Sequence, residues 1–229
     1  MKIKALLPMK GNSERVPNKN MRDFNGLPLY HAVVKSLLNS KYIECVVINT
    51  DSEVIEKDAK EIFGDKIIII NRPIEIQGDF VSMNDIIAYD LSKLDGEYFL
   101  QTHSTNPLLK SETIDKAIEK YFAGLDNFDS VFGVTKIQTR FYDKNAKAIN
   151  HNPNELLRTQ DLEPMYEENS NFYIFSKDSF KKSNNKRIGI KPQIFEVNKL
   201  EAVDIDEPED FIMAEFLYKN RDKLQLDNK

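Results

Sequence analysis

Short runs of apolar and β-branched residues alternate along the chain with longer segments of helical spacing. Strands are expected at residues 3–7, 45–49, 66–70, 98–101 and 130–134. Helices are expected between them, at residues 29–39, 52–63, 82–91 and 111–122. Continuous apolar runs of this length are typical of strands that are buried on both faces. The pattern predicts an α/β fold, an open, mostly parallel sheet that is flanked by helices and joined by right-handed crossovers.

Two of the expected helices carry start signals. Asp51 or Ser52 is placed to cap the helix at 52–63. Ser111, with Ile114 and Asp115 after it, resembles a capping box at the start of the helix at 111–122. We therefore expect a side-chain cap at the first turn of both helices.

The alternation stops after Lys136. Residues 138–164 are polar, rich in asparagine and without strong periodicity. Loops of this length are uncommon in compact domains unless they serve a function. We expect a single domain over residues 1–229 with an inserted segment at about 138–168, either an arm that reaches a neighbouring subunit or a lid over the site. Apolar runs return at 171–175 and 193–197, and a last helix is expected at 207–220.

The composition indicates a globular protein. Of the 229 residues, 41% are hydrophobic and 30% are charged, which allows one large apolar core. No segment approaches the ~18 apolar residues of a membrane helix, and the N-terminus lacks the apolar core of a secretory signal. The single cysteine, Cys45, excludes a disulfide framework within the chain. These features predict a cytoplasmic protein with no membrane partner.

The net charge of −5 argues against a nucleic-acid partner, because nonspecific binding needs a concentrated basic surface. A small anionic ligand is still open, since a few lysines suffice to make one cleft positive. Lys10, Arg15 and Lys19 gather in the segment PMKGNSERVPNKN, residues 8–20, directly after the first expected strand. Ligands of open α/β sheets bind beyond the carboxyl ends of the strands.

Loop N–H groups and lysines in such a position form a cradle for polyphosphate. The segment lacks the GxxxxGK[ST] pattern of a Walker loop and the GxGxxG pattern of a dinucleotide fold. The alternative is a solvated basic connection with no ligand.

Asp204-Ile205-Asp206 precedes the last expected helix. In an extended segment both carboxylates lie on one side, and Ile205 points to the core. Two carboxylates beside phosphate are suited to a hard ion such as Mg²⁺. The alternative is that Asp206 caps the following helix, with Pro208 in its first turn.

Six short segments between residues 3 and 211 match the motifs of one protein family, in the same order along the chain. They are residues 8–20 with Asn25-Gly26-Leu27-Pro28-Leu29; Val47 to Glu53; Asn71-Arg72-Pro73 with Glu75, Asp79 and Ser82; Leu100-Gln101 with Ser104 and Asn106-Pro107-Leu108; Glu168-Asn169-Ser170 before Phe172-Tyr173-Ile174; and Asp204-Ile205-Asp206 with Glu209-Asp210-Phe211. In this order they resemble the acylneuraminate cytidylyltransferase family, which makes CMP-sialic acids and related CMP-sugars. The resemblance implies a Rossmann-like nucleotidyltransferase fold with a small dimerisation arm, and a homodimer.

The resemblance also implies the reaction. The anomeric hydroxyl of a 2-keto sugar acid attacks the α-phosphate of CTP, pyrophosphate leaves, and Mg²⁺ or Mn²⁺ assists. Lys10, Lys19, Gln101 and Asp206 match catalytic positions, and Asp204 and Asp206 match the metal carboxylates. The positions that match the nucleotide site are Pro8, Lys10, Gly11, Asn12, Ser13, Lys19, Asn20, Arg72 and Ser82.

Within this set, Ser13 and Lys19 match contacts to the β and γ phosphates, and Asn20 matches a position beside the cytidine. Arg72 and Ser82 match positions near base and ribose, with a surface arginine and a helix cap as their alternatives. Gln101 matches a residue between nucleotide and sugar. Lys10 stands where the family usually has an arginine, so the charge is kept but the bidentate fork is lost.

The segment at residues 101–108 is longer than its counterpart in the family. It contains His103, which is either an acid–base group or, as is more common for a loop histidine, a structural hydrogen-bonding residue.

Glu167 and Glu168 stand where sialic acid enzymes tend to have an arginine, and they would repel an acidic sugar unless they meet an amino or hydroxyl group. An unusual or amino-substituted sugar is therefore expected rather than plain sialic acid. Arg140 or Arg158 in the inserted segment is then a candidate for the sugar carboxylate. An enzyme for octulosonic acid or another sugar also stays open, as does an inactive nucleotide-binding homologue.

Overall fold

A seven-stranded sheet forms the centre of the computed structural model, which describes residues 2–224. Its strand order is β5-β4-β1-β6-β8-β7-β9. Only β8 runs against its neighbours, so the expectation of a mostly parallel sheet is confirmed. The strands are β1 (Ile3–Leu6), β4 (Ile43–Thr50), β5 (Ile67–Asn71), β6 (Tyr98–Thr102), β7 (Ser130–Ile137), β8 (Met165–Ser176) and β9 (Pro192–Glu196).

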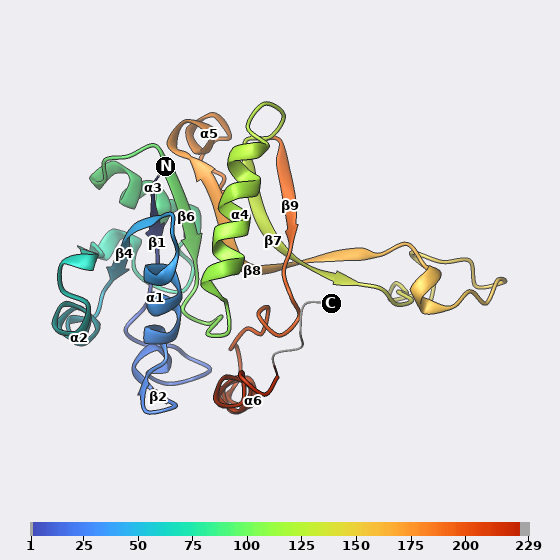
Figure 1. The fold of residues 1–229 in the computed structure, drawn as a ribbon, viewed down its shortest axis with the longest axis horizontal. Helices are drawn as coiled ribbons and strands as arrows, with labels where there is room; N and C mark the ends of the chain where they lie inside the picture. The colour runs from blue at the N-terminus through green and yellow to red at the C-terminus, as the bar shows by residue number, and fades with distance from the viewer. Residues whose placement is uncertain (1, 225–229) are drawn as a thin grey trace.

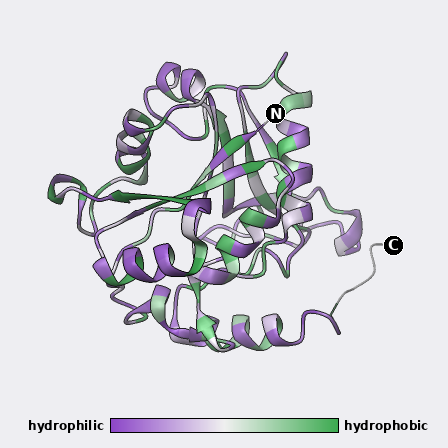
Figure 2. Ribbon diagram, turned by 60° about the vertical axis from the view of Figure 1, so that its left-hand side comes forward, coloured by the Kyte–Doolittle hydropathy of each residue, from purple (hydrophilic) through white to green (hydrophobic). Residues whose placement is uncertain are grey.

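Helices cover both faces of the sheet (Figure 1). On one face α1, α2 and α4 bury Val33, Ile55 and Ile118 against the strands, and on the other α3 and α5 bury Ile87 and Phe180. Figure 2 shows hydrophobic residues along the central strands. The helices are α1 (Tyr30–Asn39), α2 (Glu53–Phe63), α3 (Met83–Lys93), α4 (Ser111–Ala123), α5 (Lys177–Lys182) and α6 (Pro208–Lys219). None in the described part of the chain is long and apolar enough to span a membrane.

The expected helix starts are partly confirmed. Ser52 caps α2 by accepting a hydrogen bond from the backbone N–H of Ile55. The capping box at Ser111 is wrong, because Lys110 is the residue before α4 and no side chain caps the helix there. Asp115 instead accepts hydrogen bonds from Ser40 Oγ and the Lys41 N–H, which joins α4 to the end of α1.

A third apolar cluster lies outside the two faces of the sheet. It contains Val16, Phe24, Leu29, Ile205 and Phe211. The cluster packs the segment after β1 against α6 and the segment that precedes α6. Two parts of the chain that are almost 200 residues apart are thereby held together at one edge of the sheet.

The segment 138–164 leaves the body of the molecule as a long arm between β7 and β8 (Figure 1). The outer parts of the two strands pair with each other, from Val134 with Glu168 to Ile137 with Met165. Beyond them the arm holds an isolated bridge between Tyr142 and Ala148 and a short helix, η4 (Thr159–Asp161). Since the arm projects away from the sheet, it does not cover the candidate site of its own chain as a lid.

Candidate active site

Loops meet at the carboxyl edge of the parallel strands β1, β4, β5 and β6, which is where ligands of this fold class bind. The loop after β1 (residues 8–20) lies beside Asp51 at the end of β4 and residue 104 after β6. The segment 204–206 reaches the same edge, because the N–H of Ile205 donates to the carbonyl of Thr105 at 3.0 Å. The edge therefore brings together most of the residues that the sequence selected.

The loop 8–20 is fixed by its own polar groups. Pro8 is buried at the end of β1, and the N–H of Gly11 donates to Asp51 Oδ1 at 2.6 Å. Asn20 Nδ2 donates to the carbonyl of Lys10 at 2.8 Å, while its Oδ1 accepts from Ser104 Oγ at 2.6 Å. The Asn20 side chain therefore holds the loop to its neighbours. A Cβ on Gly11 would lie 2.9 Å from Ser52 Cβ, so this close approach requires glycine.

The basic residues of the loop line one hollow of about 220 Å³, together with Ser13, Glu14, Val16 and Asp79. Lys10 Nζ lies 2.5 Å from Asp79 Oδ1. Lys19 Nζ donates to the carbonyl of Ile205 at 2.6 Å, and burial lowers the pKa of Lys19 although Asp206 and Asp204 oppose that shift. The hollow thus has cations at its wall, which is the arrangement expected for a polyphosphate. Asn12 lies in the same loop between Gly11 and Ser13.

Asp204 and Asp206 flank Ile205, which is fully buried as expected. Asp204 Oδ1 is buried without a hydrogen-bond partner, and burial raises the pKa of this carboxyl group. Asp206 is exposed and pairs with Arg15 at 2.7 Å. The alternative role of Asp206 as a helix cap is wrong, because Glu207 and Asp210 form the capping box of α6.

An orphaned carboxylate oxygen beside a second carboxylate is a group that a cation would satisfy. Residues 2–224 contain no cluster of three or more acidic, histidine or cysteine side chains that could hold a metal without help. Mg²⁺ is commonly bound by one or two carboxylates together with phosphate oxygens of the substrate. The pair Asp204 and Asp206 fits this mode of binding.

Arg72 is buried, so the alternative of a surface arginine is wrong. Its Nε donates to Asn49 Oδ1 at 2.7 Å, and Nη2 donates to the carbonyls of Asn49 and Met9. Asn49 Nδ2 in turn donates to Asp90 Oδ1 at 2.5 Å. Burial raises the pKa of Asp90 to about 7. Arg72 therefore ties the ends of β1 and β4 together through a buried polar network.

Ser82 begins α3 and accepts a hydrogen bond from the Asn84 N–H at 3.2 Å, so the expected cap is confirmed.

Gln101 and His103 belong to a second buried polar group. Arg187 Nη1 donates to Gln101 Oε1 at 2.6 Å, and Gln101 Nε2 lies 3.2 Å from His103 Nε2. Burial, together with the charges of Arg187 and Lys19, lowers the pKa of His103 to about 3. His103 Nε2 faces both Gln101 Nε2 and Arg187 Nη1, and these contacts favour a structural role for His103.

Two basic residues of this edge were not selected from the sequence. Arg15, read only as part of the loop charge, pairs with Asp206 and Glu207. Arg187 lies in the stretch Asn184-Asn185-Lys186-Arg187, which has no recognisable motif. It contacts Gln101, which is 86 residues earlier in the sequence. Only contact across the fold identifies it.

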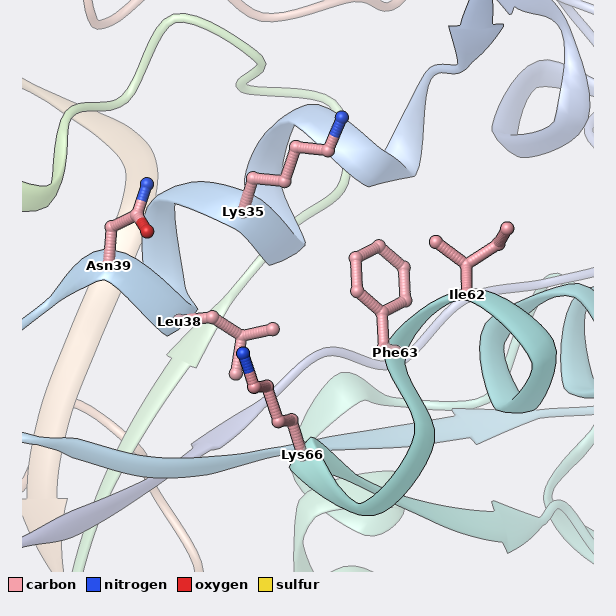
Figure 3. A pocket seen from close by; sticks show the side chains of 6 residues that line it. All are labelled: Lys35, Leu38, Asn39, Ile62, Phe63 and Lys66. Atoms are coloured by element: carbon pink, nitrogen blue, oxygen red, sulfur yellow. The ribbon is translucent and has the colours of Figure 1, made fainter.

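A further hollow lies between α1 and α2 (Figure 3). It is lined by Lys35, Leu38, Asn39, Ile62, Phe63 and Lys66. These residues directly precede the starts of β4 and β5, at the opposite edge of the sheet from the loop 8–20. The hollow is therefore separate from the candidate site.

The profile of the cytidylyltransferase family matches residues 4–228, nearly the whole chain. The chain belongs to the cytidylyltransferase family. It is thus a nucleotidyltransferase that uses CTP, and the resemblance seen in the sequence is confirmed.

Among characterised cytidylyltransferases, the pseudaminic acid cytidylyltransferase of Campylobacter jejuni is 27% identical over 96% of this chain and 97% of its own. The N-acylneuraminate cytidylyltransferase of Streptococcus agalactiae serotype III is 26% identical over 93% of this chain and 52% of its own. A solved CMP:2-keto-3-deoxy-manno-octonic acid synthetase complexed with CTP has a TM-score of 0.71 at 16% identity, covering 96% of this chain and 100% of its own. This last similarity confirms the nucleotidyltransferase fold.

Proposed function

We propose that this cytidylyltransferase joins CMP to a 2-keto sugar acid of the sialic acid type and releases pyrophosphate. One observation carries the proposal: cations suited to a triphosphate and a carboxylate pair suited to Mg²⁺ meet at the carboxyl edge of the sheet. The relatives whose names specify pseudaminic and N-acylneuraminic acids support this class of acceptor. Octulosonic acid is the alternative acceptor, since a synthetase for such an acid shares the fold.

In this proposal the triphosphate of CTP occupies the hollow of loop 8–20. Lys10, Ser13 and Lys19 line it, and they offer charge and hydrogen bonds to the β and γ phosphates. Lys10 exchanges Asp79 for phosphate oxygens, which are stronger partners because they carry more charge. Lys19 is already held at the carbonyl of Ile205, so little of its side-chain freedom is lost on binding.

Asp204 and Asp206 are the residues that would hold Mg²⁺ or Mn²⁺. When bound, such an ion offsets the charge on the phosphates during attack and departure. Arg15 pairs with Asp206 in the free chain, and it becomes available to the phosphates when Asp206 turns to the ion. Catalysis then rests mainly on positioning and on electrostatic stabilisation by this chain's own cations.

The cytidine is placed near Asn20, Arg72 and Ser82. Arg72 acts there by fixing the backbone of Met9 and Asn49, which gives the base a rigid wall. Gln101 stands between the nucleotide and the sugar, at the end of β6.

The arm at 138–164 supports a homodimer. Leu156 is 92% exposed and Tyr142 is 52% exposed, and apolar side chains of this size on a projecting arm are suited to an interface. A symmetric pair is the common arrangement for such a contact. Leu162, by contrast, is 5% exposed at the base of the arm and is not available to a partner. Sedimentation of the chain with Leu156→Asp and Tyr142→Asp tests this, with a shift to monomer expected.

A cytoplasmic setting is supported by Cys45, which is buried and unpaired. The net charge of −5 supports small-molecule substrates over nucleic acid.

The proposed function is tested by pyrophosphate release from CTP and Mg²⁺ with pseudaminic acid, N-acetylneuraminic acid and 3-deoxy-octulosonic acid as acceptors. Release with one of the first two and none with UTP or ATP is expected. Release only with octulosonic acid would select the alternative. Binding of CTP without release in any reaction would instead support an inactive homologue.

A further inference from the structure

Arg187 is a half-buried cation with no carboxylate in direct contact, although the charge of Glu168 acts on it from farther away. No acidic oxygen within residues 2–224 lies within 4.0 Å of its guanidinium nitrogens, whereas the exposed Arg15 pairs with two carboxylates and the exposed Arg158 with one. Burial lowers the pKa of Arg187, because removing the charged guanidinium from water is unfavourable. A desolvated charge of this kind is usually paired, so its missing partner calls for an explanation.

The guanidinium is held firmly by neutral groups. It lies 3.7 Å from the centroid of the Tyr173 ring, and Nη1 donates to Gln101 Oε1. Gln101 and Tyr173 are directly opposite each other on the antiparallel strands β6 and β8, so both side chains leave the same face of the sheet. The N–H of Arg187 donates to Asn84 Oδ1 at 3.4 Å, which brings it to the first turn of α3.

The hydrogen bonds also fix the orientation of the neighbouring groups. Arginine is only a donor, so Gln101 must turn its oxygen to Arg187 and its amide nitrogen to His103. His103 Nε2 therefore accepts hydrogen bonds from Gln101 and from Arg187 Nη1, and its proton resides on Nδ1. Gln101 Oε1 and His103 Nε2 are thereby the two acceptors of Arg187 Nη1.

The opposite edge of the guanidinium has no carboxylate partner. Besides Gln101 and His103, the Tyr173 side chain is the hydrogen-bonding neighbour of Arg187 within the described chain, and no carboxylate accepts from Nε or Nη2. These two nitrogens form the fork that matches the two oxygens of a carboxylate. Gln101, which accepts from Arg187, pairs with Leu6 at the end of β1, so Arg187 reaches the same edge of the sheet as the loop 8–20.

We propose that Arg187 binds the carboxylate of the acidic sugar through Nε and Nη2, and that Gln101 and Tyr173 hold it in position. The proposal rests on the proposed function and deepens it by naming the group that recognises the acid. Arg187 replaces Arg140 and Arg158 in this role, because both of these lie on the arm and Arg158 is exposed and already paired with Asp161. Glu168 is held away from the fork by its own hydrogen bond, because the Tyr173 hydroxyl donates to it.

The test compares Arg187→Gln and Arg187→Lys with the wild type, using an acid that the wild type converts and the methyl ester of the same acid. Arg221→Gln is the matched control, because Arg221 also stacks on a tyrosine, 4.1 Å from the Tyr218 ring, but lies beyond the end of α6. The readouts are KM for the sugar, KM for CTP and the thermal unfolding midpoint.

For Arg187→Gln we expect KM for the acid to rise about 10- to 100-fold while KM for CTP changes less than about twofold. The wild type should prefer the acid over the ester by a similar factor, and Arg187→Gln should lose that preference. Arg187→Lys, which keeps the charge without the fork, should recover part of it, and Arg221→Gln should match the wild type.

An acid-over-ester preference that persists in Arg187→Gln would overturn the assignment while leaving the proposed function intact. A parallel rise in both KM values, or a loss of the folded state at assay temperature in both Arg187 variants, would show that the residue is structural and would also overturn it. Absence of turnover with every acid in the wild type would defeat the proposed function, and this inference with it.

Discussion

The pH dependence of stability at Asp90 tests the buried network of Arg72, Asn49 and Asp90 at the carboxyl edge of the sheet. Its side chain is fully buried on α3, Oδ1 accepts from Asn49 Nδ2, and Oδ2 is buried without a partner. Burial raises the pKa of this carboxyl group from the ordinary value of 3.8 to about 7, although the Asn49 hydrogen bond and the Arg72 charge act against the shift. The folded protein therefore retains a proton on Asp90 over a pH range in which the unfolded chain has lost it.

The sign of the pH effect follows directly. Between pH 4 and pH 7 the folded state binds more protons than the unfolded state, so stability falls as the pH rises and levels off above pH 7. The rise of the Asp90 pKa from 3.8 to about 7 lowers the free energy of unfolding by about 4 kcal/mol at high pH. This is a large part of the ~5–15 kcal/mol that usually stabilises a domain.

Asp90→Asn replaces the carboxyl group by a neutral group of the same shape. We expect the variant to be more stable than the wild type at pH 8, with the difference growing by about 3 kcal/mol between pH 5 and pH 8. Urea unfolding at both pH values measures it. Ile87→Val on the same helix is the control, with a loss of about 1 kcal/mol at either pH.

A loss of stability for Asp90→Asn at pH 8 would refute this reasoning. It would mean that Asp90 is ionised in the folded protein and that its attraction to Arg72 exceeds the cost of burying the charge.

Three further predictions concern the site itself. Asp206→Ala should lower kcat at least about 100-fold at saturating Mg²⁺ with an unchanged far-UV spectrum, since one exposed ion pair contributes little to the fold; full activity would contradict a metal role. Gly11→Ala should destabilise the chain by about 1–3 kcal/mol and raise KM for CTP, because its Cβ would meet Ser52 at 2.9 Å; thermal melts and kinetics check both. Lys10→Arg should lower KM for CTP about two- to fivefold in pyrophosphate-release kinetics, because the arginine fork restores a bidentate phosphate contact.

The sequence was sufficient for the buried strands of the sheet because a local apolar run encodes each of them, whereas the exposed first residues of β8 have no such run. The apolar stretch Cys45-Val46-Val47-Ile48 can only be buried on both faces, and β4 is the strand that results. The cap of α4 was predicted wrongly because Ser111 fits the local pattern equally well one residue inside the helix. Ile114, three residues after Ser111, is apolar and cannot complete a capping box, and Asp115 is bonded to Ser40 and Lys41 instead.

The site was only partly accessible from the sequence. Lys10, Ser13 and Lys19 share one short segment, so their meeting at one hollow follows from the loop that carries them. Arg187 and Gln101 meet only because β6 and β8 are neighbours and the segment after α5 returns over Tyr173. The burial of Arg72 was likewise invisible, because an arginine before a proline has no hydrophobic pattern of its own.

In the free site the charged side chains are paired with one another, and this pairing affects how nucleotide and ion bind. Lys10 is paired with Asp79, and Asp206 is paired with Arg15, so the cation proposed to bind phosphate and the carboxylate proposed to bind the ion both have partners in the free chain. These pairs are exposed and therefore weak, so they keep the side chains near their working positions at little cost to ligand binding. A triphosphate alone competes only for the cations, and an ion alone competes only for Asp206. CTP and Mg²⁺ together exchange both pairs at once, and each partner that is released strengthens the binding of the other ligand. The geometry therefore favours cooperative binding of nucleotide and ion at the carboxyl edge of the sheet, where Arg187 is proposed to bind the acid.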